Sequence, residues 1–140
     1  MITENGGGTL HHTSFTHKAR FYTSGIHLSQ AKQVWICMHG YGHLATFFIN
    51  KFGCISDRVS IIVPEGLHRF YLKDANGRVG ASWMTKEDRE TDILNYYSYL
   101  DAIVESLRLG PDKSVVVLGF SQGAATAGRW VHHTLLPIEH

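Results

Sequence analysis

Residues 114–123 read Ser-Val-Val-Val-Leu-Gly-Phe-Ser-Gln-Gly, and this stretch decides the fold. Its aliphatic run is typical of a buried parallel strand, and the alanine-rich segment 124–128 favours a helix packed closely on a sheet. Gly119 and Gly123 bracket Ser121 in the pattern G-x-S-x-G, which predicts a sharp turn from the strand into the helix. Glycine suits the flanking positions because a bulky Cβ there would clash with the strand or the helix.

Ser121 stands at the apex of this turn and is the candidate nucleophile. A turn of this kind holds its serine in a strained backbone geometry. The pattern alone would occur by chance in roughly one in twenty chains of this size, given average usage of glycine and serine. The alternative is a plain strand-to-helix turn with a solvent-facing serine. The strand before the motif and the helix after it favour a nucleophile elbow.

The composition fits one globular domain. The chain has 140 residues, of which 44% are hydrophobic, so it can bury a core. A net charge of +1 without clusters of like charge gives no reason to expect nucleic acid or an anionic membrane as a partner. The N-terminus lacks the features of a signal peptide and no run is apolar enough to span a membrane, so we expect a cytoplasmic protein. Cys37 and Cys54 are expected to be reduced thiols.

Hydrophobic patterning along the rest of the chain predicts alternating strands and helices, hence an α/β fold with three layers and a mostly parallel sheet. We expect a flexible segment at 1–8 and a folded domain at 9–140. An antiparallel hairpin is expected at the sheet edge, and the section between Pro64 and the second helix is expected to be irregular. The expected elements are hairpin strands at 9–16 and 19–23, further strands at 34–38, 59–63 and 114–118, and helices at 44–52, 93–107 and after 123.

Four motifs follow one another at the ends of the expected strands and in the loops between them. In chain order they are His39-Gly40-Tyr41-Gly42, Val63-Pro64-Glu65-Gly66, Ser82-Trp83 and Gly119-Phe120-Ser121-Gln122-Gly123. With these motifs the chain resembles the phospholipase/carboxylesterase family of α/β-hydrolases, relatives of the acyl-protein thioesterases, over about residues 18–135. The resemblance implies an α/β-hydrolase fold without its C-terminal strands. It also implies a serine esterase or thioesterase that acts through an acyl-enzyme on a small or lipid-like ester, with no cofactor and no metal.

The resemblance implies a role for each motif residue. Ser121 would attack the ester or thioester carbonyl. The backbone N–H groups of Gln122 and Tyr41 would form the oxyanion hole that stabilises the developing negative charge. Gly40 and Gly42 would turn the Tyr41 amide inward beside the substrate, and a plain turn at the strand end is the alternative for these glycines.

The aromatic residues and one histidine near these motifs each allow a structural interpretation from sequence. The resemblance assigns Trp83 to substrate binding and puts Phe70 and Tyr71 where the family lines its acyl pocket, although packing is the alternative for all three. Phe120 is expected beneath the elbow. His39 is interpreted as a structural residue that braces the turn by hydrogen bonding.

Ser121 lacks the acid and the base that complete family members carry on later strands. Only nineteen residues follow it, and His132 and His133 lie on the elbow helix about 16 Å further along. We therefore expect the chain alone to be nearly inactive. Either it is the N-terminal portion of a longer hydrolase, or it associates with another chain through the unpaired edge of strand 114–118. The alternative function is a non-catalytic hydrolase remnant that serves as a binding or assembly module.

Overall fold

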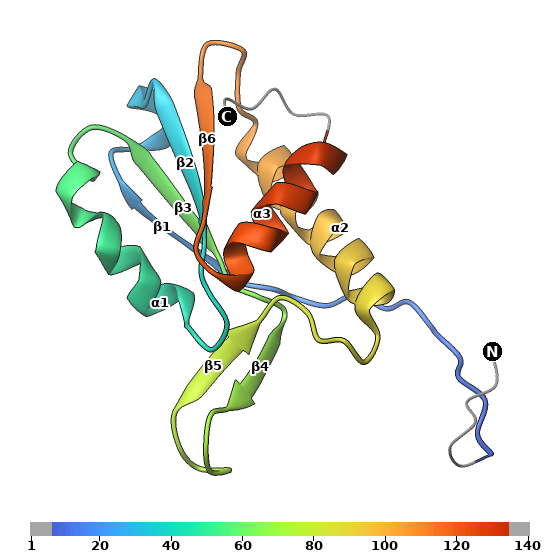
Figure 1. Ribbon diagram of the computed structural model, residues 1–140. Coiled ribbons are helices and arrows are strands. Elements are labelled where there is room, and N and C mark those ends of the chain that lie inside the picture. The colour runs from blue at the N-terminus through green and yellow to red at the C-terminus, as the bar shows by residue number, and fades with distance from the viewer. Residues whose placement is uncertain (1–6, 135–140) are drawn as a thin grey trace.

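The computed structural model describes residues 7–134 (Figure 1). Most of the segment 1–8 that we expect to be flexible therefore lies outside the described residues, as do the last six residues of the expected domain.

A four-stranded sheet forms the centre of the molecule. Its strands stand in the order β1-β3-β2-β6. The central strand β2 pairs in parallel with both β3 and β6, whereas β1 pairs antiparallel with β3. The expected α/β fold with a mostly parallel sheet is confirmed. The strands are β1 (Phe21–Gly25), β2 (Gln33–Met38), β3 (Ser60–Pro64) and β6 (Ser114–Gly119).

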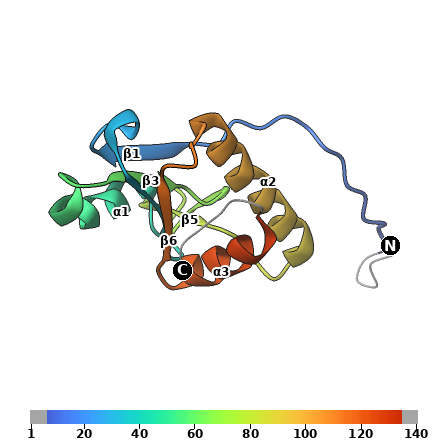
Figure 2. The same cartoon turned by 90° about the horizontal axis from the view of Figure 1, so that it is seen from above.

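Helices cover both faces of this sheet, as Figures 1 and 2 show. The short helix α1 and the 3₁₀-helix η2 lie on one face, and α2 and α3 lie on the other. A further 3₁₀-helix, η1, precedes β2. The expected three layers are therefore present. The helices are η1 (Leu28–Gln30), α1 (Ala45–Phe48), η2 (Ile49–Ile55), α2 (Arg89–Leu107) and α3 (Gln122–His133).

Each face of the sheet has its own core, because successive side chains of a strand point to opposite faces. Along β2, Val34, Ile36 and Met38 belong to the larger core, which α2 and α3 complete with Tyr96, Leu100 and Trp130. Cys37, between them in sequence, belongs to the smaller core under α1 and η2. The buried members of that smaller core are Cys37, Ala45, Phe48, Val59, Ile61 and Val63.

A second, two-stranded sheet follows β3 where the sequence predicts irregular structure. It is the antiparallel hairpin of β4 (His68–Tyr71) and β5 (Val79–Ser82), which projects away from the main sheet (Figure 1). Ala81 of β5 and His43 form an isolated bridge, with the Ala81 N–H donating to the His43 carbonyl at 3.0 Å. The hairpin is thus joined to the loop that follows β2.

The N-terminal hairpin predicted from 9–16 and 19–23 is wrong. Residues 10–20 contain no strand and are exposed along their whole length. A hairpin built from them would have no buried apolar face to stabilise it. Phe21–Gly25 instead forms β1, which pairs at five positions along β3, from Phe21 opposite Pro64 to Gly25 opposite Ser60.

Candidate active site

Ser121 lies where β6 ends and α3 begins. It is the N-cap of α3, and its backbone has φ 57° and ψ −119°. Residues with a Cβ rarely adopt such a conformation, which favours glycine. Among residues 7–134 only Arg108, at the C-cap of α2, shares a positive φ without being glycine. The residue is exposed, as expected at the apex of a sharp turn.

The two glycines of the motif allow backbone segments to approach closely. A Cβ built on Gly119 would lie 2.3 Å from the Gly123 carbonyl oxygen, inside van der Waals contact. A Cβ on Gly123 would lie 2.2 Å from the Met38 carbonyl oxygen at the end of β2. The first turn of α3 therefore packs directly on the backbone of the central strand.

The loop after β2, residues 39–43, lies against Ser121. A Cβ on Gly40 would come within 3.2 Å of the Ser121 Cβ and of the Phe120 carbonyl oxygen. Gly42 has φ 78°, and its N–H donates to the Ala81 carbonyl at 2.9 Å. These two glycines let the loop turn sharply beside the serine.

The backbone N–H groups of Tyr41 and Gln122 are the expected oxyanion donors. Gln122 is the first residue of α3, so its N–H has no acceptor within the helix. The N–H groups on either side of Tyr41, those of Gly40 and Gly42, both have partners. Within the described part of the chain, neither the Tyr41 nor the Gln122 N–H donates a hydrogen bond. Both are available to a ligand.

His39 is buried and uses both of its ring nitrogens. Its Nε2 accepts the Gly66 N–H at 2.9 Å, so its Nδ1 carries the proton and donates to the Gly40 carbonyl at 2.7 Å. Burial lowers the pKa of His39, which keeps the ring neutral. In this arrangement His39 braces the loop, in agreement with the sequence interpretation, and has no nitrogen left to act as a base.

His43 also borders the serine, although sequence analysis did not single it out. Its Nδ1 accepts the Gly40 N–H at 3.2 Å, and its ring stacks on Phe120 with the centroids 5.9 Å apart. The position of His43, three residues after Gly40 in a glycine-rich loop, could have identified it, because a side-chain acceptor there can close a turn.

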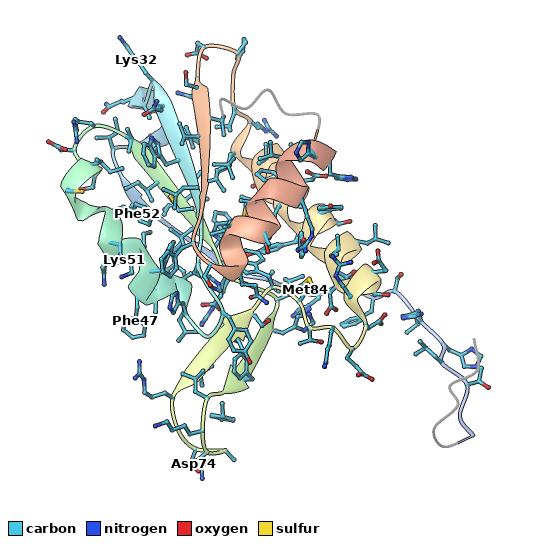
Figure 3. All side chains as sticks on the ribbon, viewed as in Figure 1. Lys32, Phe47, Lys51, Phe52, Asp74 and Met84 are labelled. Atoms are coloured by element: carbon cyan, nitrogen blue, oxygen red, sulfur yellow. The ribbon has the colours of Figure 1, made fainter. Side chains whose placement is uncertain are left out.

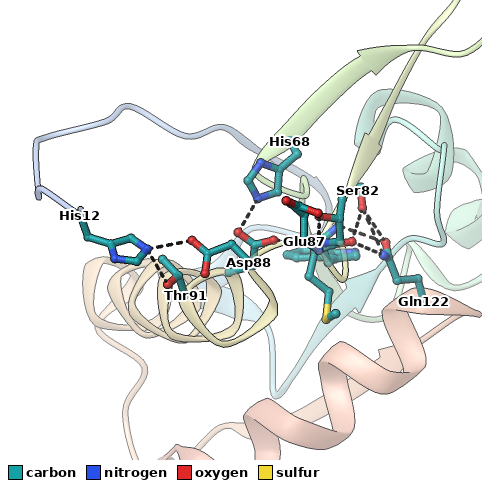
Figure 4. A network of polar contacts seen from close by, with 11 residues as sticks. His12, His68, Ser82, Glu87, Asp88, Thr91 and Gln122 are labelled. Carbon is teal, nitrogen blue, oxygen red and sulfur yellow. Dashed lines mark hydrogen bonds and ion pairs between the residues drawn. The ribbon is translucent and has the colours of Figure 1, made fainter. Parts of the chain in front are cut away.

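The Gln122 side chain fixes the start of α3 to the segment that follows β5 (Figure 4). Its Oε1 accepts the Trp83 N–H at 3.0 Å. Its Nε2 donates to the Met84 carbonyl at 3.0 Å and to Ser82 Oγ at 3.1 Å. Met84 lies between the hairpin and α3 in Figure 3, in keeping with this link. The sequence pattern gave no indication of this side-chain role.

Two aromatic side chains differ from the sequence expectations. Trp83 has no exposed surface, and its indole N–H donates to the His39 carbonyl at 2.9 Å. It supports the loop from the core, so direct substrate contact by this ring is not supported. Phe120 does not pack beneath the elbow, because the close approach of Gly123 to β2 leaves no room there. Its side chain is 54% exposed and covers one side of His43.

Exposed aromatic side chains lie next to the serine in the elbow and in the Gly40 loop. Phe120, which precedes Ser121, is 54% exposed, and Tyr41, which follows Gly40, is 58% exposed. Tyr41 pairs with Phe70 of β4, with the ring centroids 5.2 Å apart. Tyr71 of the same strand is also exposed, and Phe47 projects from the hairpin end of α1 in Figure 3.

Two histidine–carboxylate pairs occur at the start of α2 (Figure 4). His12 Nε2 lies 2.9 Å from Asp88 Oδ2, and His68 Nε2 lies 3.3 Å from Asp92 Oδ1. The first pair attaches the N-terminal segment to α2, and the second attaches β4 to it. Neither pair was anticipated from the sequence.

Comparison with known proteins identifies the family of the chain. Residues 27–133 match the family model described as Phospholipase/Carboxylesterase. No protein with a curated function matches the chain. Among residues 7–134, no helix combines the length and the hydrophobicity that a membrane crossing requires.

Several solved structures share the fold. A phospholipase/carboxylesterase from Dyadobacter fermentans is 21% identical, with a TM-score of 0.58 over 84% of this chain and 55% of that one. Esterase PE8 is 22% identical, with a TM-score of 0.59 over 81% and 57%. Acyl-protein thioesterase 2 from Zea mays is 19% identical, with a TM-score of 0.57 over 79% and 49%. The chain spans about half the length of these proteins, and it belongs to the phospholipase/carboxylesterase family of α/β-hydrolases.

Proposed function

We propose that the protein is a serine hydrolase that cleaves carboxylic esters or thioesters, with Ser121 as the nucleophile. The observation that carries the proposal is the conformation of Ser121, whose positive φ holds it exposed at the elbow and against the Gly40 loop. A serine has no structural reason to hold a strained backbone where glycine would fit without strain. Family membership supports the hydrolase class.

The proposed reaction begins with attack of Ser121 Oγ on the substrate carbonyl carbon. As the new C–O bond forms, the carbonyl electron pair moves to the oxygen, and the Tyr41 and Gln122 N–H groups donate to this oxyanion. Collapse of the intermediate restores the carbonyl and expels the alcohol or thiol, which takes the proton that Ser121 gave up. Water then releases the acid from the acyl-enzyme by the same steps.

A general base must move that proton, and we propose that the acid and base lie outside residues 7–134. His39 has both nitrogens engaged, and the ring of His43 carries its proton on Nε2 because Nδ1 is an acceptor. The length of the similar structures, about twice that covered here, supports this proposal. Without a base, turnover falls by a factor of about 10⁶ in a comparable triad.

The apolar surface around Ser121 supports an ester with an apolar acyl group as the substrate. Exposed Tyr41 and Phe120 flank the serine from the loop and from the elbow. Burying an acyl chain against such rings removes apolar area from water at about 25 cal/mol per Å². A small-molecule or lipid-like ester or thioester fits this surface.

A fluorophosphonate probe tests the proposal, because it phosphonylates an activated serine without needing turnover. The test compares the full-length protein with its Ser121→Ala and Ser106→Ala variants. We expect labelling of the wild type and of Ser106→Ala, whose exposed serine lies on α2, and none of Ser121→Ala. Absence of labelling in the full-length wild type would instead support the hydrolase remnant that binds without catalysis.

A further inference from the structure

Every polar backbone group of Gly40 is held by a histidine of its own loop. Its carbonyl accepts from His39 Nδ1 at 2.7 Å and from the His43 N–H at 3.3 Å. Its N–H donates to His43 Nδ1 at 3.2 Å. These contacts therefore fix both peptide planes that flank Gly40. Without them the planes could rotate, because glycine has the widest choice of backbone conformations.

The orientation of Gly40 sets the direction of the Tyr41 N–H. The Gly40 carbonyl and the Tyr41 N–H belong to one planar, trans peptide unit, so they point in opposite directions. Holding the carbonyl on one side aims the N–H to the other. The Gly40 N–H belongs to the preceding peptide unit, so its contact with His43 Nδ1 fixes the other side of the glycine and limits rotation there.

The His43 ring lies beside Ser121 and is itself held in place. A Cβ built on Gly40 would lie 3.3 Å from Cε1 of this ring and 3.2 Å from the Ser121 Cβ. Phe120 stacks on the ring at 5.9 Å between centroids, and Phe48 at 6.2 Å. The ring thus connects the loop, the elbow and α1.

Only the neutral ring can make the contact to the Gly40 N–H. Because Nδ1 is the acceptor, the proton of the neutral ring sits on Nε2. A second proton would occupy Nδ1 and face the Gly40 N–H, so the hydrogen bond would be lost. The same tautomer prevents His43 Nε2 from accepting the Ser121 proton.

We propose that His43 is a positioning residue of the active site: its Nε2-protonated ring accepts the Gly40 N–H and, together with the two contacts to the Gly40 carbonyl, holds the Tyr41 N–H in the direction of the oxyanion. This inference rests on the proposed function of Ser121 and adds a residue that acts through the loop.

Nuclear magnetic resonance of the ¹⁵N-labelled full chain tests the contact directly. We expect His43 to carry its proton on Nε2, so that Nδ1 accepts the Gly40 N–H. The Gly40 amide resonance should change little in His43→Gln, whose side-chain oxygen can accept the same N–H, and should move in His43→Phe, which has no acceptor. His132→Gln, at an exposed site on α3, should leave the resonance unchanged. A proton on Nδ1, or a Gly40 resonance that does not respond to His43→Phe, would overturn the proposal.

A pair of substitutions separates the hydrogen bond from the packing of the ring. His43→Phe keeps an aromatic ring for Phe48 and Phe120 but removes the acceptor, whereas His43→Gln keeps an acceptor. We expect amide exchange at Gly40 to accelerate about fivefold more in His43→Phe than in His43→Gln, the equivalent of one hydrogen bond of about 1 kcal/mol. Equal rates in the two variants would show that only packing matters.

Labelling of Ser121 connects the contact to the active site. In the full-length protein, fluorophosphonate labelling of Ser121 should be slower in His43→Phe, which lacks the acceptor, than in His43→Gln, which keeps one. A protein in which Ser121 never labels overturns the proposed function but leaves the Gly40 resonance as the test of the contact. Equal labelling rates in the two variants would reject the positioning role.

Discussion

Ser121 holds a backbone conformation that costs about 1–3 kcal/mol for a residue with a side chain. Glycine would remove this cost, although it also raises the entropy of the unfolded chain. We therefore predict that Ser121→Gly increases the free energy of unfolding by about 1 kcal/mol, net of that entropy, and abolishes labelling. Urea unfolding followed by circular dichroism measures the change. Ser121→Ala is the control, because alanine keeps the strain and should gain no stability.

The close contact of the elbow with β2 predicts a second effect. A Cβ at Gly123 would collide with the backbone oxygens of Met38 and His39, neither of which is a flexible side chain. We expect Gly123→Ala to lower the free energy of unfolding by about 1–3 kcal/mol and to displace Ser121. Gly128→Ala is a matched control in the same helix, since nothing lies within 4 Å of its Cβ position.

The control substitution Gly128→Ala should change the free energy of unfolding in the opposite direction. Alanine is the better residue in a helix interior, so Gly128→Ala should stabilise the protein by up to about 1 kcal/mol. Equal urea midpoints for Gly123→Ala and Gly128→Ala would contradict the close packing of α3 on β2.

At the residue scale, the sequence predicts the roles that depend on one motif and misses those that depend on contacts between motifs. Ser121 and its two glycines follow from G-x-S-x-G because the turn is local. The burial of Trp83 and the exposure of Phe120 depend on how the elbow meets β2 and the loop. Aromatic residues suit either environment, so the pattern could not distinguish them.

At the element scale, the end of β3 is connected to several parts of the chain through Glu65. This buried carboxylate contacts Arg20 at 2.6 Å and Arg69 at 3.2 Å, and accepts the Ala45 N–H at 3.1 Å. Burial alone would raise its pKa, but the contacts with Arg20, the Ala45 N–H and Arg69 outweigh this and hold the pKa of Glu65 below its ordinary value. One side chain thus joins the residue before β1 to α1 and β4.

The lowered pKa of Glu65 predicts a dependence of stability on pH. The unfolded state binds the proton more tightly than the folded state, so the stabilisation is complete above the unfolded pKa of about 4.3 and is lost as the pH falls through the folded pKa. Urea midpoints measured between about pH 6 and about pH 3 should fall less steeply for Glu65→Gln than for the wild type. Glu105→Gln, on the exposed side of α2, is the control. Parallel curves for the wild type and Glu65→Gln would contradict this assignment.

The elements that the sequence predicts correctly have strong local patterns. The buried strands β2, β3 and β6 are continuous apolar runs, and each begins within one residue of its expected position. Hydrophobic periodicity alone places the start of α2 at residue 93, because its first turn is polar. The polar segment 85–88, interpreted from sequence as a cap, does contain the N-cap residue Asp88, although its side chain makes no capping hydrogen bond.

The hairpin of β4 and β5 could have been predicted from its turn. Asn76-Gly77 lies between the two strands, and the Gly77 N–H donates to the Asp74 carbonyl at 2.9 Å. An Asn-Gly pair between two runs of strand formers is a strong hairpin signal. Three of the four residues of β4 are exposed, and β5 is a run of small residues, so neither strand shows apolar alternation.

At the scale of the whole molecule, β6 is an edge strand of the described sheet, with β2 as its neighbour. The sequence predicts an unpaired edge here, and an aliphatic edge of this kind tends to pair with another strand. We predict that the 140-residue chain associates through β6, with a mass above 15.7 kDa by light scattering.

A charge on the edge strand tests this association. Val116→Lys, in the middle of β6, should restore a mass of 15.7 kDa, because an edge lysine opposes strand pairing. Leu94→Lys is the control, since it adds the same charge at an exposed apolar site on α2. A monomeric wild-type chain would refute the prediction, as would dissociation caused by Leu94→Lys alone.

The smaller core under α1 and η2 has a further consequence. It contains six buried residues and is covered by a four-residue helix and a 3₁₀-helix, so this layer should open more readily than the one formed by α2 and α3. Cys37 is sealed beneath it, and burial raises the pKa of its thiol to about 12. When the exposed Cys54 is replaced by serine, a thiol reagent can modify the protein only after α1 and η2 have moved away from Cys37. The rate at which Cys37 is modified therefore reports how often the layer formed by α1 and η2 opens.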